Sequence, residues 1–362
     1  MLVLVGLISR SYGRALTYPG SASWSVRTVD WLRENGGGTP INALEVWYYS
    51  RHAPPTHGNP STGQLPPPPT PAQSLEVTQA GRASRSPSPI PLVGPARPGE
   101  GRWVPGPDAG GHPASYTSWF RPDPKHPTLV AGVLWLDQRH VRFDLVAGTK
   151  EPGGGPWPGS AQIPAAQRSR TVAAFNAAFN AGFLAVDSGG GFYEAGRSHG
   201  ALRPGVASLV IDRSGAIQIG TWGQQVHRTA DTYAVRQNLH LVVDHGAPVR
   251  GLVTNAKKRW GSRSSQLQYT WRSGIGIDGH GHVVFVAGDH FTLTTLADAL
   301  ARAGATEAMQ LDIHPDQVTA NLYDLGRLDP RKAPVKLLPN MVRPASRYLT
   351  PDQRDFITAR LR

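Results

Sequence analysis

One carboxylate and one arginine in the C-terminal half of this sequence are residue types that could do chemistry. Asp312 ends the short apolar run 307–313, where a charged side chain is costly to bury unless it is paired or used. Such a carboxylate can act as a base, a nucleophile or an orienting group. Arg272 carries a guanidinium, which can hold a phosphate in a two-pronged fork. The structural alternatives are that Asp312 caps a strand end and that Arg272 pairs with Asp312 or Asp278 to fix a hairpin.

Two further side chains, His314 and Asp316, follow Asp312 at alternate positions. Alternate residues of an extended strand point to one face, so the three could offer oxygen, nitrogen and oxygen ligands to a divalent metal ion. Without a metal, an imidazole beside two carboxylates would stay charged above its usual pKa of about 6.5, and activity would change between about pH 6 and 8. The remaining alternative is a loop that merely tolerates substitution.

A hairpin, one helix and a buried strand must position these residues. Residues 274–286 hold two β-branched runs around the turn sequence Asp-Gly-His-Gly, which is a strong hairpin signal. Thr292 or Thr294 can cap a helix whose apolar residues recur at helical spacing and which ends at Gly304. The run 307–313 is short enough for a core strand.

The order and spacing of these elements resemble the phosphodiester glycosidase family. That family has an Arg before a small-residue hairpin, here 272–278, then a helix, here 292–305, and then a strand that ends Leu-Asp-Gly-Gly-Gly-Ser, here beginning at Leu311–Asp312. Residues 176–180 occupy the place of an Asn-Gly-Gly-aromatic-Phe segment upstream. The resemblance covers roughly residues 125–360, the size of one domain, and implies a divergent, bacterial member that acts on sugar 1-phosphodiesters.

The sequence departs from the family where the glycine-rich loop should follow Asp312. Residues 313–316 read Ile-His-Pro-Asp instead. Glycines allow backbone N–H groups to approach a phosphate or sugar closely, whereas Pro315 has no N–H to offer. Asn176 is likewise followed by two alanines in place of glycines. The resemblance therefore implies the scaffold more firmly than the substrate.

The resemblance also assigns roles to individual residues. Cleavage needs a cation for the phosphate, a carboxylate at the sugar carbon and donors for the sugar hydroxyls. The catalytic candidates are Asp312, Arg272 and His314, and the substrate-binding candidates are Asn176, Asn180, Glu194, His199 and Asp316. The two asparagines could instead satisfy backbone groups in the bend after Phe175. Glu194 and His199 are candidate general acids in a polar loop, or simply solvated loop residues.

Composition excludes several other classes of protein. The chain has no cysteine, so it has no disulfide, no thiolate zinc site and no cysteine nucleophile. Its net charge is +12, but only six of the 37 basic residues are lysines, a bias typical of GC-rich coding rather than of a nucleic-acid-binding face. The charge would steer an acidic substrate, such as a phosphodiester polymer, toward the protein. We expect no nucleic-acid partner.

Three segments are expected along the chain. Residues 1–50 predict a helix capped by Ser21 or Ser23 and ended near Gly36, followed by a strand over 41–49. Their first apolar run is too short for a membrane span, and no basic segment precedes it as in a signal sequence, so we interpret it as a remnant of an anchor lost through a late start. Residues 51–125 are Pro- and Gly-rich and predict a linker or wrapping arm. Residues 126–362 predict the phosphodiester glycosidase-like domain.

The expected fold class is α+β: a mainly antiparallel β-sheet domain with few short helices. We predict a hairpin from residues 128–136 and 141–147, and a second from 208–211 and 216–222. Residues 239–243 predict a further strand, and 354–357 a closing one.

The expected function is hydrolysis of a sugar 1-phosphodiester in a cell-envelope or exopolysaccharide glycan. The expected partner is a glycan or sugar-phosphate polymer, and the expected location is extracytoplasmic, with membrane contact only through the lost anchor. No cofactor is expected, although a divalent metal is an option. The alternative is a non-catalytic envelope protein that keeps the fold and binds a glycan or polyanion.

Overall fold

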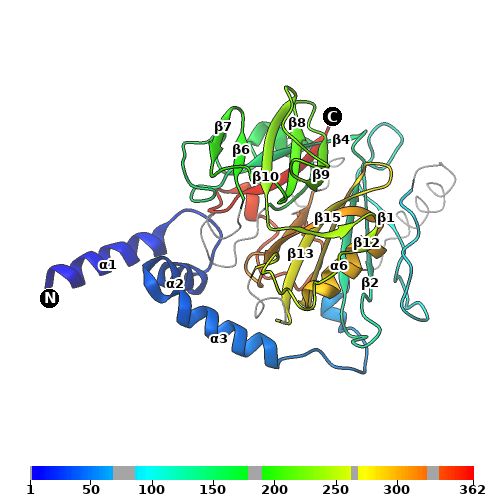
Figure 1. Ribbon diagram of the computed structural model, residues 1–362, viewed down its shortest axis with the longest axis horizontal. Helices are drawn as coiled ribbons and strands as arrows, with labels where there is room; N and C mark the ends of the chain where they lie inside the picture. Colours follow the sequence, from blue (N-terminus) through cyan, green and yellow to red (C-terminus); the bar gives the residue numbers. More distant parts are fainter. Residues whose placement is uncertain (1, 68–85, 178–189, 262–267, 324–333) are drawn as a thin grey trace.

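The chain begins with three helices that lie beside a body of β-sheets (Figure 1). The computed structural model describes residues 2–67, 86–177, 190–261, 268–323 and 334–362. The N-terminal helices are α1 (Leu2–Thr17), α2 (Trp24–Leu32) and α3 (Gly38–Arg51). Residues Arg33–Gly37 form a kink between α2 and α3, where Asn35 and Gly36 leave helical backbone geometry. In the described residues, no helix combines the length and the apolar character that crossing a membrane requires.

The predicted N-terminal cap of α2 is confirmed, because the side chain of Ser23 accepts a hydrogen bond from the backbone N–H of Val26. The predicted strand over 41–49 is wrong, because these residues form part of α3. Pro40 is tolerated in the first turn of a helix, and the Ala-Leu-Glu run that follows consists of strong helix formers. Local helix propensity outweighs the β-branched and aromatic residues further along.

The largest sheet has eight strands, and every neighbouring pair in it is antiparallel. Its centre is the predicted hairpin, β13 and β14, flanked by β15. In spatial order the strands are β1 (Val104–Pro105), β2 (Ser115–Phe120), β3 (Ala131–Leu136), β14 (Val283–Phe291), β13 (Thr270–Asp278), β15 (Ala305–Ile313), β11 (Leu241–Asp244) and β12 (Ala247–Pro248). The first two come from the segment predicted as a Pro-rich linker or arm.

Two five-stranded antiparallel sheets complete the body. One has the order β7 (Arg197–His199), β6 (Phe192–Glu194), β10 (Thr232–Gln237), β8 (Ala207–Asp212) and β9 (Ile217–Thr221). The other has the order β17 (Val335–Lys336), β16 (Ala320–Leu322), β5 (Thr171–Asn176), β18 (Phe356–Leu361) and β4 (Val141–Val146). Short 3-10 turns lie at Thr62–Gln64, Ala165–Arg170 and Arg347–Leu349. The α+β fold class, mainly antiparallel, is confirmed.

Of the two other predicted hairpins, one is confirmed and one is wrong. Strands β8 and β9 pair as expected. Strands β3 and β4 follow each other in the chain but belong to different sheets, where β3 pairs with β2 and β14 and β4 pairs with β18. Every residue of β3 is buried, whereas β4 alternates between buried and half-buried residues. A strand buried on both faces belongs inside a sheet that is covered on both sides, as the large sheet is, whereas the alternation of β4 is typical of a strand with one face on the core.

The core lies where the three sheets face one another. One cluster of buried side chains draws residues from all of them, including Leu134, Phe143, Phe175, Leu209 and Phe285. On the opposite face of the large sheet, α6 (Leu293–Arg302) packs through its buried apolar side. Thr292 caps this helix by accepting from the N–H of Thr295, as predicted.

The small-residue run before Asp278 has a packing reason. A Cβ atom added at Gly274 would lie 2.7 Å from Leu300 Cδ1 and 3.0 Å from the carbonyl oxygen of Met309. Glycine at this position therefore lets α6 lie closely against β13. The close packing fixes the end of β13, where Arg272 and Ser273 are located.

Part of the Pro-rich segment is tied to the body by a buried ion pair. Glu100 accepts two hydrogen bonds from the guanidinium of Arg121, each 2.9 Å long, and a third from that residue's backbone N–H. Ile90 is buried in the cluster on the α6 face. The described residues from 86 onward thus follow the surface of the large sheet.

Candidate active site

The candidate site is built around Asp312, the last residue but one of β15. Its side chain is 1% exposed, and its Oδ1 atom lies 3.8 Å from Nη1 of Arg354. Arg354 belongs to the segment that leads into β18, so the contact joins the large sheet to the β4–β18 sheet. Burial lowers the pKa of Arg354, but the carboxylates of Asp312, Asp30 and Glu151 outweigh it and hold the pKa above its ordinary value. Arg354 therefore stays charged beside the Asp312 carboxyl group.

Asn176 joins the same two sheets beside Asp312. Its amide nitrogen donates to Oγ of Ser273 at 2.9 Å, and that hydroxyl donates to the carbonyl oxygen of Asp312 at 3.0 Å. Its amide oxygen accepts from the N–H of Thr319 at 3.1 Å. Both ends of the amide therefore hold the framework around Asp312, through partners on other segments rather than in the bend after Phe175. Asn180 lies outside the described residues.

Arg272 lies next to this network but is completely enclosed. Its side chain has no exposed surface, and its Nε donates to the carbonyl oxygen of Phe291 at 2.8 Å. A second, longer hydrogen bond of 3.4 Å runs from Nη2 to the carbonyl oxygen of Gln268. Burial lowers the pKa of Arg272 to about 9. An arginine that donates to main-chain carbonyls on two neighbouring segments holds these segments together, whatever further role it has.

His314 is placed differently from the expectation. Strand β15 ends at Ile313, and His314 adopts a left-handed φ of 79°, with its N–H donating to the carbonyl oxygen of Trp271. The imidazole Nε2 lies 3.8 Å from Oε2 of Glu45 on α3. Burial and the neighbouring arginines 33, 272 and 354 lower the pKa of His314 to about 3. The predicted charged imidazole is therefore wrong: desolvation and three cations outweigh the nearby carboxylates.

The metal alternative finds no site in the described part of the chain. There, no three His, Asp or Glu side chains are grouped in a way that could hold a metal ion. The prediction assumed that Asp312, His314 and Asp316 lie on one continuous extended strand. The left-handed turn at His314 ends that alternation.

Glu194 and His199 lie on the β7–β6–β10–β8–β9 sheet, where Phe192 pairs with His199. Glu194 is only 4% exposed, so it is not a solvated loop residue. Burial, with a smaller contribution from Asp144 on β4, raises the pKa of Glu194 to about 7. The charged residue that acts on Glu194 is thus Asp144 on β4, not a residue of the segment around Asp312.

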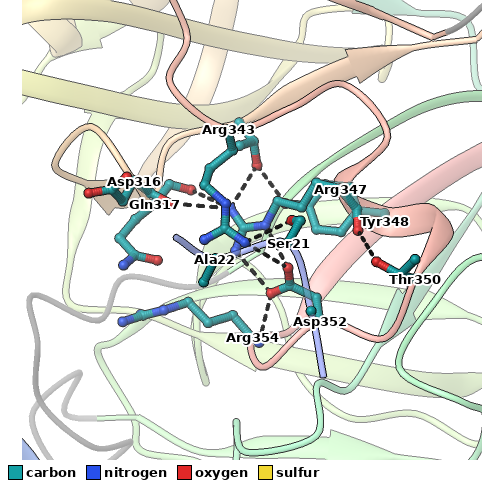
Figure 2. A network of polar contacts seen from close by, with 12 residues as sticks. Ser21, Ala22, Asp316, Gln317, Arg343, Arg347, Tyr348, Thr350, Asp352 and Arg354 are labelled. Carbon is teal, nitrogen blue, oxygen red and sulfur yellow. Dashed lines mark hydrogen bonds and ion pairs between the residues drawn. The ribbon is translucent and has the colours of Figure 1, made fainter. Parts of the chain in front are cut away.

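Sequence reasoning missed a set of charged residues that follow β17, shown in Figure 2. Arg347 holds both oxygens of the Asp352 carboxylate, with Nε–Oδ2 at 2.7 Å and Nη2–Oδ1 at 2.9 Å. Arg343 Nη2 lies 3.6 Å from Oδ2 of Asp352. Arg354 comes two residues after Asp352, and its Nη1 lies 3.8 Å from Oδ1 of Asp312. The only signal in the sequence is the density of charges over 343–355, which has no periodicity that predicts a site.

The N-terminal segment closes over these residues. Arg343 Nη2 donates to Oγ of Ser21 at 2.9 Å. Between the two parts lies a cavity of about 10 Å³, room for one water molecule. It is lined from the N-terminal side by Pro19, Gly20, Ala22 and Asp30, and from the body by Gln317, Arg343, Arg347, Asp352, Gln353 and Arg354.

Comparison with known proteins gives a match over the centre of the chain. Residues 172–312 match the sequence model of the phosphodiester glycosidase family. The matched segment holds Asn176, Arg272 and Asp312 and ends before His314. No curated protein matches the chain by sequence.

Three solved structures are similar to the chain. A hypothetical protein from Synechocystis has 13% identity and a TM-score of 0.40, with 70% of this chain and 63% of that chain covered, so less than two thirds of that protein is spanned. The zebrafish N-acetylglucosamine-1-phosphodiester alpha-N-acetylglucosaminidase catalytic domain, auto-inhibited by its pro-peptide, has 14% identity and a TM-score of 0.43, with 71% and 87% covered. A protein from Burkholderia pseudomallei described as exported has 14% identity and a TM-score of 0.32, with 69% and 75% covered. The predicted resemblance is confirmed: across residues 172–312 this chain is similar to the phosphodiester glycosidase family, as a divergent relative.

Proposed function

We propose that the protein is a hydrolase of the phosphodiester glycosidase type that cleaves a sugar 1-phosphodiester. The observation that carries this proposal is the position of Asp312. It is the last residue of the family-matched segment, and its carboxyl group lies 3.8 Å from the guanidinium of Arg354. A charged partner keeps a buried carboxylate ionised, which a base or nucleophile requires.

In the proposed reaction, the bond between the sugar C1 and the phosphate oxygen breaks. A water oxygen adds to C1, one of its protons is lost to solvent or to a base, and a phosphate monoester leaves. Asp312 would activate that water or stabilise the positive charge that develops at C1. Asn176 and Ser273 would act by positioning, because their hydrogen bonds lead to the carbonyl of Asp312.

The leaving group explains why the site does not need a strong general acid. A phosphate monoester is stable as an anion near neutral pH, so it can leave without first taking a proton. His314, with its pKa lowered to about 3, stays neutral and could not protonate it in any case. We therefore assign no acid role to His314.

We infer a glycan of the cell envelope or an exopolysaccharide as the substrate, and an extracytoplasmic location. The support is the net charge of +12, which favours an acidic polymer. The sugar 1-phosphate linkage of such a polymer is the chemistry that the family resemblance implies.

One observation favours a second candidate, a non-catalytic protein that binds a glycan or polyanion. Asp312 is 1% exposed, and residues 19–22 lie over the neighbouring arginines. In the Ile-His-Pro-Asp sequence, Pro315 has no N–H, and the His314 N–H is already bonded to the carbonyl oxygen of Trp271, so these two cannot replace the N–H groups of a glycine loop.

The test is a panel of aryl sugar 1-phosphodiesters, measured alongside binding to a teichoic-type polymer. Release of the aryl phosphate, abolished in Asp312→Asn, is the expected result. Binding of the polymer without turnover of any ester would favour the non-catalytic candidate.

A further inference from the structure

The loop that follows β12 gathers positive charge without any acidic residue. The sequence has no aspartate or glutamate between Asp244 and Asp278. We call residues 249–261, which lie within this stretch, the cationic loop. In the described part of the chain, none of its basic residues takes part in an ion pair. These residues, all exposed, are Arg250, Lys257, Lys258 and Arg259.

Two buried residues fix the backbone of the cationic loop. Asn255 and Trp260 are both buried. The Nδ2 atom of Asn255 donates to the carbonyl oxygen of Gly261 at 2.9 Å, and its Oδ1 atom accepts from the N–H of Trp260 at 3.3 Å. The indole N–H of Trp260 donates to the carbonyl oxygen of Leu241 at 2.9 Å. The N–H of Lys258 donates to the carbonyl oxygen of Asn255 at 3.0 Å. The charges of the loop are therefore presented from a fixed turn.

The cationic loop is attached to the part of the large sheet that holds Asp312. The imidazole Nδ1 of His240 donates to the carbonyl oxygen of Arg259 at 3.1 Å. The residue before His240 is Leu239, which packs against Ile313, the residue after Asp312. Strand β11 pairs with β15 along this side of the site. The loop and Asp312 are thus neighbours across the start of β11, and one extended ligand can contact both.

The composition of the loop favours a phosphorylated glycan over a nucleic acid. Single-stranded nucleic acids are held by cations together with aromatic rings on which the bases stack. The only aromatic residue of the loop is Trp260, which is buried and bonded through its indole N–H to the β11 backbone. Lysine binds a phosphate as a point charge and needs no base beside it. Exposed cations without a stacking surface therefore suit a chain of phosphates separated by sugars.

We propose that the cationic loop is an accessory binding site for an anionic glycan chain, where Lys257, Lys258 and Arg259 bind the phosphates while one linkage of the same chain lies at Asp312. The proposal rests on the proposed function for the identity of the chain. It makes the substrate a polymer with recurring phosphodiesters rather than a small sugar phosphodiester. Binding at a second place on the protein raises the effective concentration of linkages at Asp312.

The test is fluorescence anisotropy of an end-labelled polysaccharide of repeating N-acetylmannosamine 1-phosphate, measured over a series of salt concentrations. The loop variant is Lys257→Gln/Lys258→Gln/Arg259→Gln. At about 0.1 M salt it should bind the polymer about tenfold more weakly than the native chain. Its affinity should also depend less steeply on salt, because fewer phosphate contacts release counterions. Dextran, a neutral polysaccharide, should not compete.

The matched control is Arg10→Gln/Arg14→Gln/Arg51→Gln, which removes the same number of charges from exposed positions on α1 and α3. It should keep the native affinity, since salt screens charges that lie far from the bound polymer. Thermal melts check that both variants are folded. Equal losses of affinity in the two variants would show that only net charge matters, and would overturn the loop as a site.

The remaining outcomes separate the accessory site from the proposed function. Polymer binding that depends on the loop, without turnover of the polymer or of any aryl ester, would leave the accessory site standing while the proposed function fails. Turnover of the polymer with unchanged affinity in the loop variant would overturn the accessory site alone. Absence of polymer binding by the native chain would also overturn it. A DNA oligonucleotide of the same charge that binds as tightly as the polymer would overturn the assignment of a glycan.

Discussion

Arg354 and Asp312 meet at 3.8 Å although they come from segments that belong to different sheets. The contact brings a residue of the family-matched segment together with one that lies after it. A cation at this distance favours the ionised form of a buried carboxyl group, and breaking such a pair leaves an uncompensated charge in the interior. The relationship therefore bears on both catalysis and stability.

Asp312→Asn should reduce turnover of an aryl sugar 1-phosphodiester by about 10²–10⁴-fold, because the amide keeps the shape but cannot act as base or nucleophile. The measurement is the rate of aryl phosphate release at saturating substrate. Asp244→Asn, a change at the half-exposed end of β11, is the control and should keep the native rate. A native rate in Asp312→Asn, with a normal melt, would remove Asp312 from the mechanism.

Arg272→Lys should lower stability by about 1–3 kcal/mol and leave phosphate affinity unchanged. A lysine carries no planar fork, so it cannot reproduce donation to both the Phe291 and Gln268 carbonyls from a fully enclosed position. Urea unfolding measures the loss, and the control is Arg302→Lys at the end of α6, where the arginine is only half-buried. If stability stayed constant while phosphate binding weakened, Arg272 would hold the phosphate after all.

His314→Gln should make the protein less sensitive to mild acid. The folded-state pKa of His314 is lowered to about 3, against about 6.5 in an unfolded chain, so between these values the unfolded state binds more protons. Stability from this group is therefore fully present above about pH 6.5 and is lost as the pH falls toward 3. Melting temperatures of the native chain and the variant, measured from pH 7 to pH 4, should converge as the pH falls. Parallel curves would show that His314 titrates normally.

The sequence allowed the framework of the site to be predicted where local signals agree with the fold. The hairpin β13–β14, the Thr292 cap and strand β15 all have short-range signatures, in turn residues, capping residues and periodicity. Strand β3 failed this test because one partner, β14, lies far away in the sequence and the other, β2, belongs to the segment expected to be a linker or arm, so the following apolar run, β4, was paired with it wrongly.

The charges around Asp312 could not be predicted for the same reason. Arg354 reaches Asp312 only through the docking of β18 between β4 and β5, which is a long-range pairing without a local signal. The pKa of His314 depends on burial and on Arg33, Arg272 and Arg354, the first of which lies more than two hundred residues earlier in the chain. The nearby residues Asp312 and Asp316 suggested that the His314 imidazole is charged. Burial and arginines from other segments instead lower its pKa.

Glu194→Gln should stabilise the protein at alkaline pH and not in acid. Burial raises the pKa of Glu194 to about 7, against about 4.5 in the unfolded chain, so between these values the folded state binds more protons. Stability therefore falls as the pH rises from about 4.5 to 7, and it stays low above that, because the charged carboxylate is buried beside Asp144. At about 1.4 kcal/mol per pKa unit, the full effect is about 3 kcal/mol.

The measurement is the free energy of unfolding in urea at pH 4 and pH 8, for the native chain and Glu194→Gln. The glutamine keeps the shape of the side chain but cannot ionise, so the two proteins should differ at pH 8 and agree at pH 4. Glu307→Gln, a half-buried glutamate on β15, is the matched control and should show no such divergence. Equal stability of the native and Glu194→Gln proteins at pH 8 would mean that the ionised Glu194 is solvated or paired. The structure argues against this, because Glu194 is 4% exposed and its Oε2 is buried without a hydrogen-bond partner.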